Sequence, residues 1–131
     1  MIVIDSSALI AILNGEPERV AFLRAIENSD GCIMSAVTLL ESRMVIRGRF
    51  GATALTDLVT LLDEITPQVA PFDAGQSDFA FSGFSRFGKG MGSAAKLNMG
   101  DCATYALAKS LNLPLLYKGD DFKATDITAA A

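Results

Sequence analysis

The strongest constraint on the fold of this chain is the alternation of short apolar runs with longer helical patterns along its 131 residues. A strand pattern followed by helical patterns, repeated several times, is typical of an α/β domain with a parallel sheet. We find no linker and no internal repeat, and a chain of this length normally forms one domain. The sequence therefore predicts a single α/β domain over residues 1–131.

The expected strands are short and apolar, and the expected helices have recognisable ends. Strands are predicted at residues 2–4, 32–35, 68–72 and 113–119. Helices are predicted at residues 6–15, 16–28, 35–50, 52–65, 73–87 and 101–112. Asp5 or Ser6 would cap the first helix, and Gly15 would end it. The glycine-rich residues 88–100 are predicted to form a loop before the last helix.

The absence of histidine excludes several kinds of catalysis. Ser-His-Asp and Cys-His triads, imidazole acid–base pairs and histidine-bound zinc all need this side chain. The net charge of −4 also means that any contact with nucleic acid must be local and basic. Cys32 and Cys102 form no CxxC pair, so we interpret both as buried thiols.

No apolar run approaches the roughly 20 residues that cross a bilayer. The opening "MIVID" also lacks the basic start of a signal peptide. We therefore expect a cytoplasmic protein with no membrane contact.

Five acidic residues stand near predicted strand ends and helix starts or within a helical stripe: Asp5, Glu41, Asp101, Asp120 and Asp121. Ligand sites of open parallel sheets lie at the carboxyl ends of the strands, where Asp5 and the last two acids are expected. Glu41 falls among Val37, Leu40, Met44 and Val45, the apolar stripe expected on its helix.

Each of these acids also has an ordinary structural interpretation. Asp5 and Asp101 suit helix caps, the pair at 120–121 suits a solvated turn, and Glu41 could reach solvent at the stripe's edge. If they converge instead, their mutual repulsion is relieved by a cation. Oxygen ligands without histidine or cysteine pairs select Mg²⁺ or Mn²⁺, which can activate water and stabilise charge at a phosphodiester. The convergence hypothesis therefore predicts nuclease chemistry.

Four stretches, spanning essentially the whole chain, resemble the PIN domain and within it the VapC-type toxins of bacterial toxin–antitoxin systems. They are "VIDSSALIAIL", "SAVTLLESRMV", "FGKGMGSAAKLNMGDCATYALAK" and "LPLLYKGDDFKATDI". The resemblance implies a three-layer α/β/α sandwich with a mostly parallel sheet and a metal-dependent endoribonuclease that inhibits translation. It implies catalytic and metal-binding roles for Asp5, Glu41, Asp101 and a C-terminal aspartate, with Ser6 or Ser7 assisting through their hydroxyls.

The fourth acidic ligand stays open between Asp120, where relatives often carry Asn, and Asp121, which we favour. The glycine-rich loop has Met91, Gly92 and Ser93 where relatives commonly have basic residues or histidine and a proline. The remaining candidates for RNA phosphate contacts are Arg43, Arg47, Arg49, Arg86, Lys89 and Lys96, which could equally be solvated charges. The loop also lacks the spacing of a P-loop, since Gly90 follows Lys89.

The resemblance implies a VapB-type antitoxin as partner and an RNA substrate such as tRNA or rRNA. The helix predicted at 52–65 is apolar over a wide arc, so we expect an antitoxin helix or a second copy of the chain, as in a homodimer, to cover part of it. Two other function classes stay open. One is a PIN-like scaffold that binds RNA or a partner without cleavage. The other is a different Mg²⁺-dependent phosphotransfer enzyme, such as a haloacid-dehalogenase phosphatase or a response-regulator receiver.

Overall fold

The four strands form one parallel sheet with the first strand of the chain in its interior. The computed structural model describes residues 1–131. The strands are β1 (Ile2–Ile4), β2 (Cys32–Ser35), β3 (Gln68–Ala70) and β4 (Leu115–Leu116), in the order β3-β2-β1-β4. Every pairing is parallel, and Val3 has Ile33 as its partner on one side and Leu115 on the other. The predicted α/β fold with a parallel sheet is confirmed.

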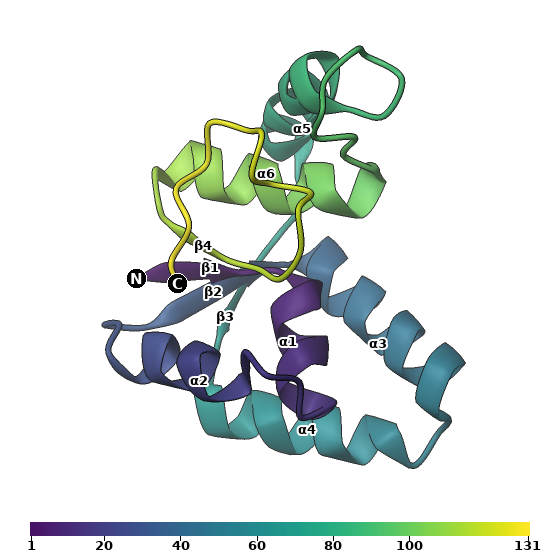
Figure 1. The fold of residues 1–131 in the computed structure, drawn as a ribbon, viewed down its shortest axis with the longest axis vertical. Coiled ribbons are helices and arrows are strands. Elements are labelled where there is room, and N and C mark those ends of the chain that lie inside the picture. Colours follow the sequence, from purple (N-terminus) through teal and green to yellow (C-terminus); the bar gives the residue numbers. More distant parts are fainter.

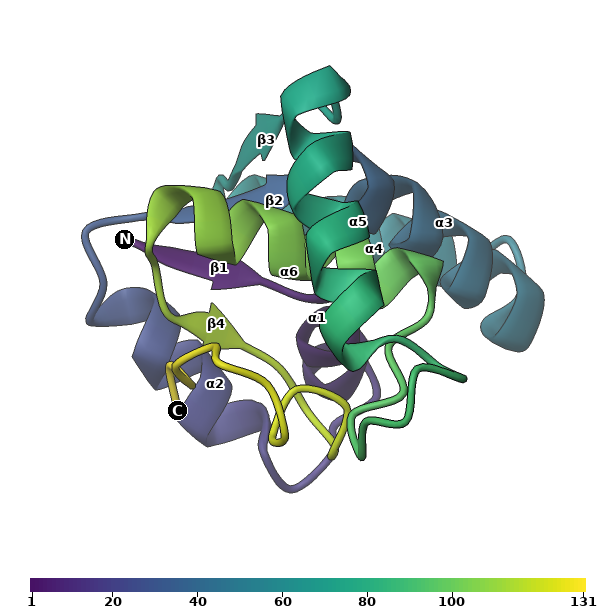
Figure 2. The same ribbon diagram turned by 90° about the horizontal axis from the view of Figure 1, so that it is seen from above.

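Six helices connect the strands and cover both faces of the sheet. They are α1 (Ser6–Leu13), α2 (Arg19–Glu27), α3 (Ala36–Phe50), α4 (Ala54–Ile65), α5 (Ala74–Phe87) and α6 (Met99–Leu111). Figure 1 shows α5 and α6 on one side of the sheet and α1, α2 and α4 on the other. Seen from above in Figure 2, α6 lies over the strands and runs roughly along them, and α5 crosses α6. This is the predicted three-layer arrangement.

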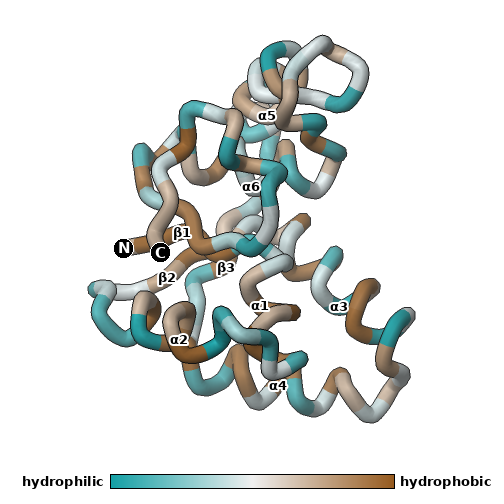
Figure 3. The backbone as a smooth tube through the Cα atoms, viewed as in Figure 1, coloured by the Kyte–Doolittle hydropathy of each residue, from teal (hydrophilic) through white to brown (hydrophobic).

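The strands are apolar on both faces because each face supplies a separate core. Ile2 and Ile4 pack with α1, α2 and α4, whereas Val3 between them packs with α5 and α6. Successive side chains of a strand point to opposite faces, and both faces are apolar when helices cover a parallel sheet on both sides. The central strands accordingly stand out as apolar in Figure 3. Cys32 and Cys102 are free and buried, as predicted.

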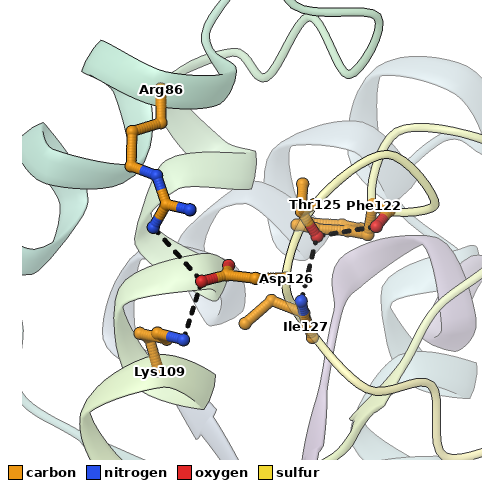
Figure 4. Close-up of polar contacts among 6 residues, drawn as sticks. All are labelled: Arg86, Lys109, Phe122, Thr125, Asp126 and Ile127. Carbon is orange, nitrogen blue, oxygen red and sulfur yellow. Dashed lines mark hydrogen bonds and ion pairs between the residues drawn. The ribbon is translucent and has the colours of Figure 1, made fainter.

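The C-terminal segment is fastened to the edge of β4. The Leu115 N–H donates to the Thr128 carbonyl at 2.9 Å, and the Ala130 N–H donates to the Leu115 carbonyl at 2.8 Å. Figure 4 shows Asp126 accepting from Lys109 of α6 at 2.7 Å and from Arg86 of α5 at 3.2 Å. The far end of the loop that follows β4 is therefore held against β4, α5 and α6.

Several predicted boundaries were wrong. Strand β3 ends at Ala70 rather than at 72, and α2 and α4 begin at Arg19 and Ala54 rather than at 16 and 52. The last strand covers only Leu115–Leu116 of the predicted 113–119, because the chain then turns away towards the acidic loop. Helix α6 begins at Met99, two residues earlier than predicted, because Asn98 caps it. None of the helices is both long and apolar enough to cross a membrane.

Candidate functional site

A hollow of about 400 Å³ lies where β1 and β4 end, and we call it the acidic pocket. Its walls include four of the five predicted acids, which come from separate parts of the chain: Asp5, Glu41, Asp101 and Asp121. Further walls are supplied by Ser6, Ser7, Ile10, Glu16, Val45, Arg49, Asn98 and Lys118. The predicted convergence of the acids at the carboxyl ends of the strands is what the structure shows.

Asp5 directly follows β1, and its buried carboxylate caps α1 while it faces the acidic pocket. Its Oδ2 accepts from the Ser7 backbone N–H at 3.1 Å and from the Ser7 hydroxyl at 2.6 Å. Its Oδ1 accepts from the Thr104 hydroxyl at 2.7 Å. Both interpretations of Asp5 are therefore compatible: it is a helix cap whose carboxylate is also held rigidly at the pocket.

Glu41 reaches the acidic pocket from α3, where the Ser6 hydroxyl donates to its Oε1 at 2.6 Å. The apolar stripe proposed around Glu41 was wrong, because Leu40 and Met44 are 57% and 64% exposed. The buried residues of α3 are Thr38, Ser42 and Ile46, which recur every four residues. Glu41 lies beside this buried row rather than inside it, so its carboxylate can line the pocket.

Asp101 occupies the first turn of α6 and is a partner in its capping box. The Asn98 side chain accepts from the Asp101 N–H at 2.9 Å, and Asp101 Oδ2 accepts from the Asn98 N–H at 3.1 Å. Burial raises the pKa of Asp101 to about 7, and the charges of Asp5, Asp121 and Glu41 add to this, while the Asn98 N–H opposes it. A pKa near neutrality shows how strongly the pocket disfavours another negative charge.

The two adjacent aspartates after β4 have different surroundings. Asp121 lines the acidic pocket, and burial together with the charges of Asp5 and Asp120 raises its pKa. The side chain of Asp120 is 89% exposed and pairs with Lys123 at 2.7 Å, which lowers its pKa. The structure thus brings Asp121 to the pocket and leaves Asp120 outside it.

The donor set of the acidic pocket fits a hard divalent cation. Every polar candidate ligand is an oxygen, and hard ions such as Mg²⁺ and Mn²⁺ prefer carboxylates and water. No three acidic side chains are arranged to hold one ion together. Asp5, Glu41 and Asp101 each accept a hydrogen bond from a protein donor. Mg²⁺ is commonly bound by one or two carboxylates with several waters, which the pocket can provide without a preformed cage.

Comparison with known proteins decides the family. The model of the PIN domain matches residues 2–127. This chain belongs to the PIN-domain family. The VapC ribonuclease Mb0640 of Mycobacterium bovis is 40% identical to it over 129 residues, which is 98% of each chain.

Solved structures show the same PIN fold. VapC20 of Mycobacterium tuberculosis, described as a toxin that cleaves the sarcin-ricin loop, superposes with a TM-score of 0.78 at 16% identity, covering 98% of this chain and 97% of that one. A toxin–antitoxin complex from Klebsiella pneumoniae gives a TM-score of 0.72 at 15% identity, covering 100% and 98%. The chain therefore has the PIN fold, and not the phosphatase or receiver fold that the sequence left open.

The cations proposed to contact RNA are scattered over this PIN domain. Of the six, Arg49 lines the acidic pocket, while Arg43 and Arg47 line a separate hollow between α3 and α4. Arg86 is engaged with Asp126 at 3.2 Å and stacks over the Phe87 ring. Lys89 and Lys96 lie in or beside the loop between α5 and α6. The six candidates therefore do not form one basic surface.

Sequence reasoning missed two uncharged residues of the site. Thr104 donates to Asp5 and shares a hydrogen bond of 3.1 Å with Thr38, which ties α6, α3 and the end of β1 together. Gly100 lies against Glu41: a Cβ atom there would be 2.7 Å from the Glu41 carboxyl carbon. Only the placement of Gly100 before Asp101 hinted at such close packing, and Thr104 gave no signal beyond being a polar residue in an apolar helix.

Proposed function

We propose that this PIN-domain protein is a metal-dependent endoribonuclease that hydrolyses RNA phosphodiester bonds. The observation that supports the proposal best is the meeting of four carboxylates, from four separate elements or loops, in one pocket without any histidine. A structural role alone would leave each acid with its cap or turn, not with three other acids. The curated relative named above is also a ribonuclease.

The proposed ligands are Asp5, Glu41, Asp101 and Asp121. We leave Asp120 out of the proposed set because its side chain is exposed and pairs with Lys123. A bound Mg²⁺ or Mn²⁺ would supply an activated water and stabilise charge on the phosphate. The chain's own residues would orient that ion: Ser7 and Thr104 fix Asp5, and Ser6 fixes Glu41. These hydroxyls keep two carboxylates rigid, which lowers the cost of reorganisation during the reaction.

We further propose that the protein inhibits translation as the toxin of a toxin–antitoxin pair and that an antitoxin helix occupies the hollow between α3 and α4. This hollow of about 420 Å³ is lined mainly by apolar side chains: Met44, Leu55, Leu58, Val59 and Leu62. Arg43 and Arg47 stand at it, so an amphipathic helix with acidic flanks would match its chemistry. The similarity to a toxin–antitoxin complex supports the proposal.

Substitution of the two rigidly held acids tests the proposed activity. Asp5→Asn and Glu41→Gln should each abolish or greatly reduce Mn²⁺-dependent cleavage of total RNA, with EDTA as the control. Asn caps a helix about as well as Asp, so Asp5→Asn should leave the metal-free protein at least as stable as the parent.

Metal binding gives a second readout that does not depend on finding the right RNA. An ion that binds only the folded state stabilises it by about 2.7 kcal/mol at a hundredfold excess over Kd. The melting temperature of the parent should therefore rise with Mn²⁺, and those of the two variants much less. A parent whose melting point ignores millimolar Mn²⁺ and Mg²⁺ would refute the metal-site assignment, and metal binding without RNA cleavage would favour the non-cleaving scaffold.

A further inference from the structure

Lys118 stands on the wall that the acidic pocket shares with a second hollow. This second hollow, of about 290 Å³, is lined by Tyr117, Gly119, Lys123 and other residues, and Lys118 is the one residue that lines both spaces. A polynucleotide strand longer than one nucleotide must leave the acidic pocket in some direction. A strand that leaves towards the second hollow passes Lys118.

The backbone of Lys118 is fixed relative to the acids. Its N–H donates to the Ser7 hydroxyl at 3.0 Å, and the same hydroxyl donates to Asp5 at 2.6 Å. The Cα atom of Lys118 is therefore positioned by the hydrogen bonds that also hold Asp5. A long side chain on a fixed Cα atom can move its ammonium group while the metal site stays in place.

The ammonium group of Lys118 is held by two carboxylates on the α1–α2 connection. It pairs with Glu16 and with Glu18, the latter at 3.1 Å, and the Lys118 side chain is 34% exposed. Ion pairs at such exposure contribute little stability. An RNA phosphate can therefore take the place of a glutamate as the partner of Lys118 at little cost in free energy. Glu16 itself lines the acidic pocket, which puts the ion pair beside the space that the substrate would enter.

The acidic pocket needs cations because it must accept a polyanion. Arg49 and Lys118 are the only basic residues among those that line it, and Arg49 forms no ion pair. A divalent ion neutralises part of the carboxylate charge but leaves the flanking phosphates of the RNA without partners. Lys118 is the cation whose position is fixed by the site.

We propose that Lys118 binds the phosphate next to the scissile bond, with the adjoining nucleotide in the second hollow, and that Glu16 and Glu18 compete for Lys118 when no RNA is present. This inference rests on the proposed ribonuclease function, because it assigns part of the same substrate. The ordinary alternative is that Lys118 only fastens the α1–α2 connection to the end of β4. The two interpretations predict opposite effects on RNA binding when the charges of the two glutamates are removed.

Binding of a short fluorescent single-stranded RNA, measured by anisotropy, separates them. All variants carry Asp5→Asn, so that the RNA stays intact and binding is read even if the parent shows no cleavage. Lys118→Gln should weaken binding about fivefold, Lys118→Arg should keep it, and Glu16→Gln with Glu18→Gln should strengthen it. Lys109→Gln, which removes a lysine paired with Asp126 away from the pocket, serves as the matched control.

Two further measurements test whether the effect of Lys118→Gln on RNA binding is purely structural or a general effect of charge. Lys118→Gln should reduce the slope of log affinity against log salt by about 0.7, the value for one phosphate contact on a single strand, whereas Lys109→Gln should not. In a Lys118→Gln background, the two glutamate substitutions should no longer strengthen binding. The inference is overturned if Lys118→Gln matches Lys109→Gln, if the glutamate variants bind more weakly, if their gain persists without Lys118, or if the RNA does not bind. Failure of the parent to cut RNA with Mn²⁺ would instead count against the proposed function.

Discussion

At the residue scale, Gly100 is the position where the acidic pocket leaves no space for a side chain. The residue lies in the first turn of α6, and the Glu41 carboxylate occupies the place of its missing Cβ atom. The close approach lets Glu41 lie near the N-terminal end of α6, where the helix dipole favours a negative charge. A glycine in a helix otherwise costs about 1 kcal/mol relative to alanine.

Gly100→Ala should therefore separate stability from function. The added methyl group should displace Glu41 from the pocket, so we expect loss of Mn²⁺-dependent cleavage and a smaller Mn²⁺-induced rise in melting temperature. The metal-free protein should unfold within about 1 kcal/mol of the parent, because alanine favours the helix. Gly48→Ala is the control, since Gly48 lies in α3 with open space around its missing Cβ atom. Full activity of Gly100→Ala would show that the position of Glu41 is unimportant.

The residue scale is also where prediction from sequence was least complete. Charged residues could be selected because a buried or clustered carboxylate needs a structural or chemical reason. Four acids of the pocket were found in this way, whereas Glu16, which also lines it, was not. Thr104 and Gly100 carry no charge, and their importance arises from what α6 packs against. The choice between Asp120 and Asp121 depended on which way the loop turns, which spacing does not specify.

At the scale of elements, the order of strands and helices followed from the sequence, whereas the faces of α3 did not. The apolar residues of α3 were assumed to point towards the core, but Thr38 and Ser42 take these positions. They can be buried because each has a hydrogen bond: Thr38 with Thr104, and Ser42 with the Thr38 carbonyl at 2.7 Å. Met44 is consequently left on the outside, where it lines the hollow with α4.

This hollow gives a prediction for the element pair α3 and α4. Val59 is 57% exposed at the hollow, so Val59→Glu would put a charge where a partner helix is proposed to bury apolar surface. We expect loss of binding to the proposed antitoxin, with at least a tenfold increase in Kd and unchanged RNA cleavage. Co-purification and calorimetric titration would measure the binding.

The matched control for that variant is Val20→Glu on α2, because Val20 is 58% exposed and lies away from the hollow. It should bind the antitoxin like the parent. Sedimentation of the isolated chain distinguishes a second copy from an antitoxin as the occupant. A self-associating parent that becomes monomeric only on Val59→Glu would assign the hollow to a homodimer, and equal antitoxin binding by both variants would remove the hollow from the antitoxin interface.

At the scale of the whole molecule, the clustered acids make folding and proton uptake interdependent. A carboxyl group whose pKa is raised by folding holds its proton more tightly in the folded state, so it favours folding below its unfolded pKa of about 4. This contribution is lost as the pH rises through the folded-state value, which is about 7 for Asp101. The chain has no histidine to titrate in the same range.

The metal-free protein should therefore lose stability between pH 5 and pH 8. We expect its melting temperature in EDTA to fall by roughly 5 °C or more over this range, because about 1 kcal/mol corresponds to several degrees for a domain of this size. Asp101→Asn should flatten the dependence, since the amide has no proton to lose and can still accept from the Asn98 N–H in the capping box. Asp57→Asn, which changes an exposed acid in the first turn of α4, should keep the slope of the parent.

Saturating Mn²⁺ should reverse the slope, because the metal competes with the proton for the carboxylates and binds more tightly as the pH rises. A metal-free parent that is equally stable at pH 5 and pH 8 would mean that burial and the neighbouring carboxylates do not raise the pKa of Asp101 in solution, and the case for a cation among them would lose its electrostatic basis.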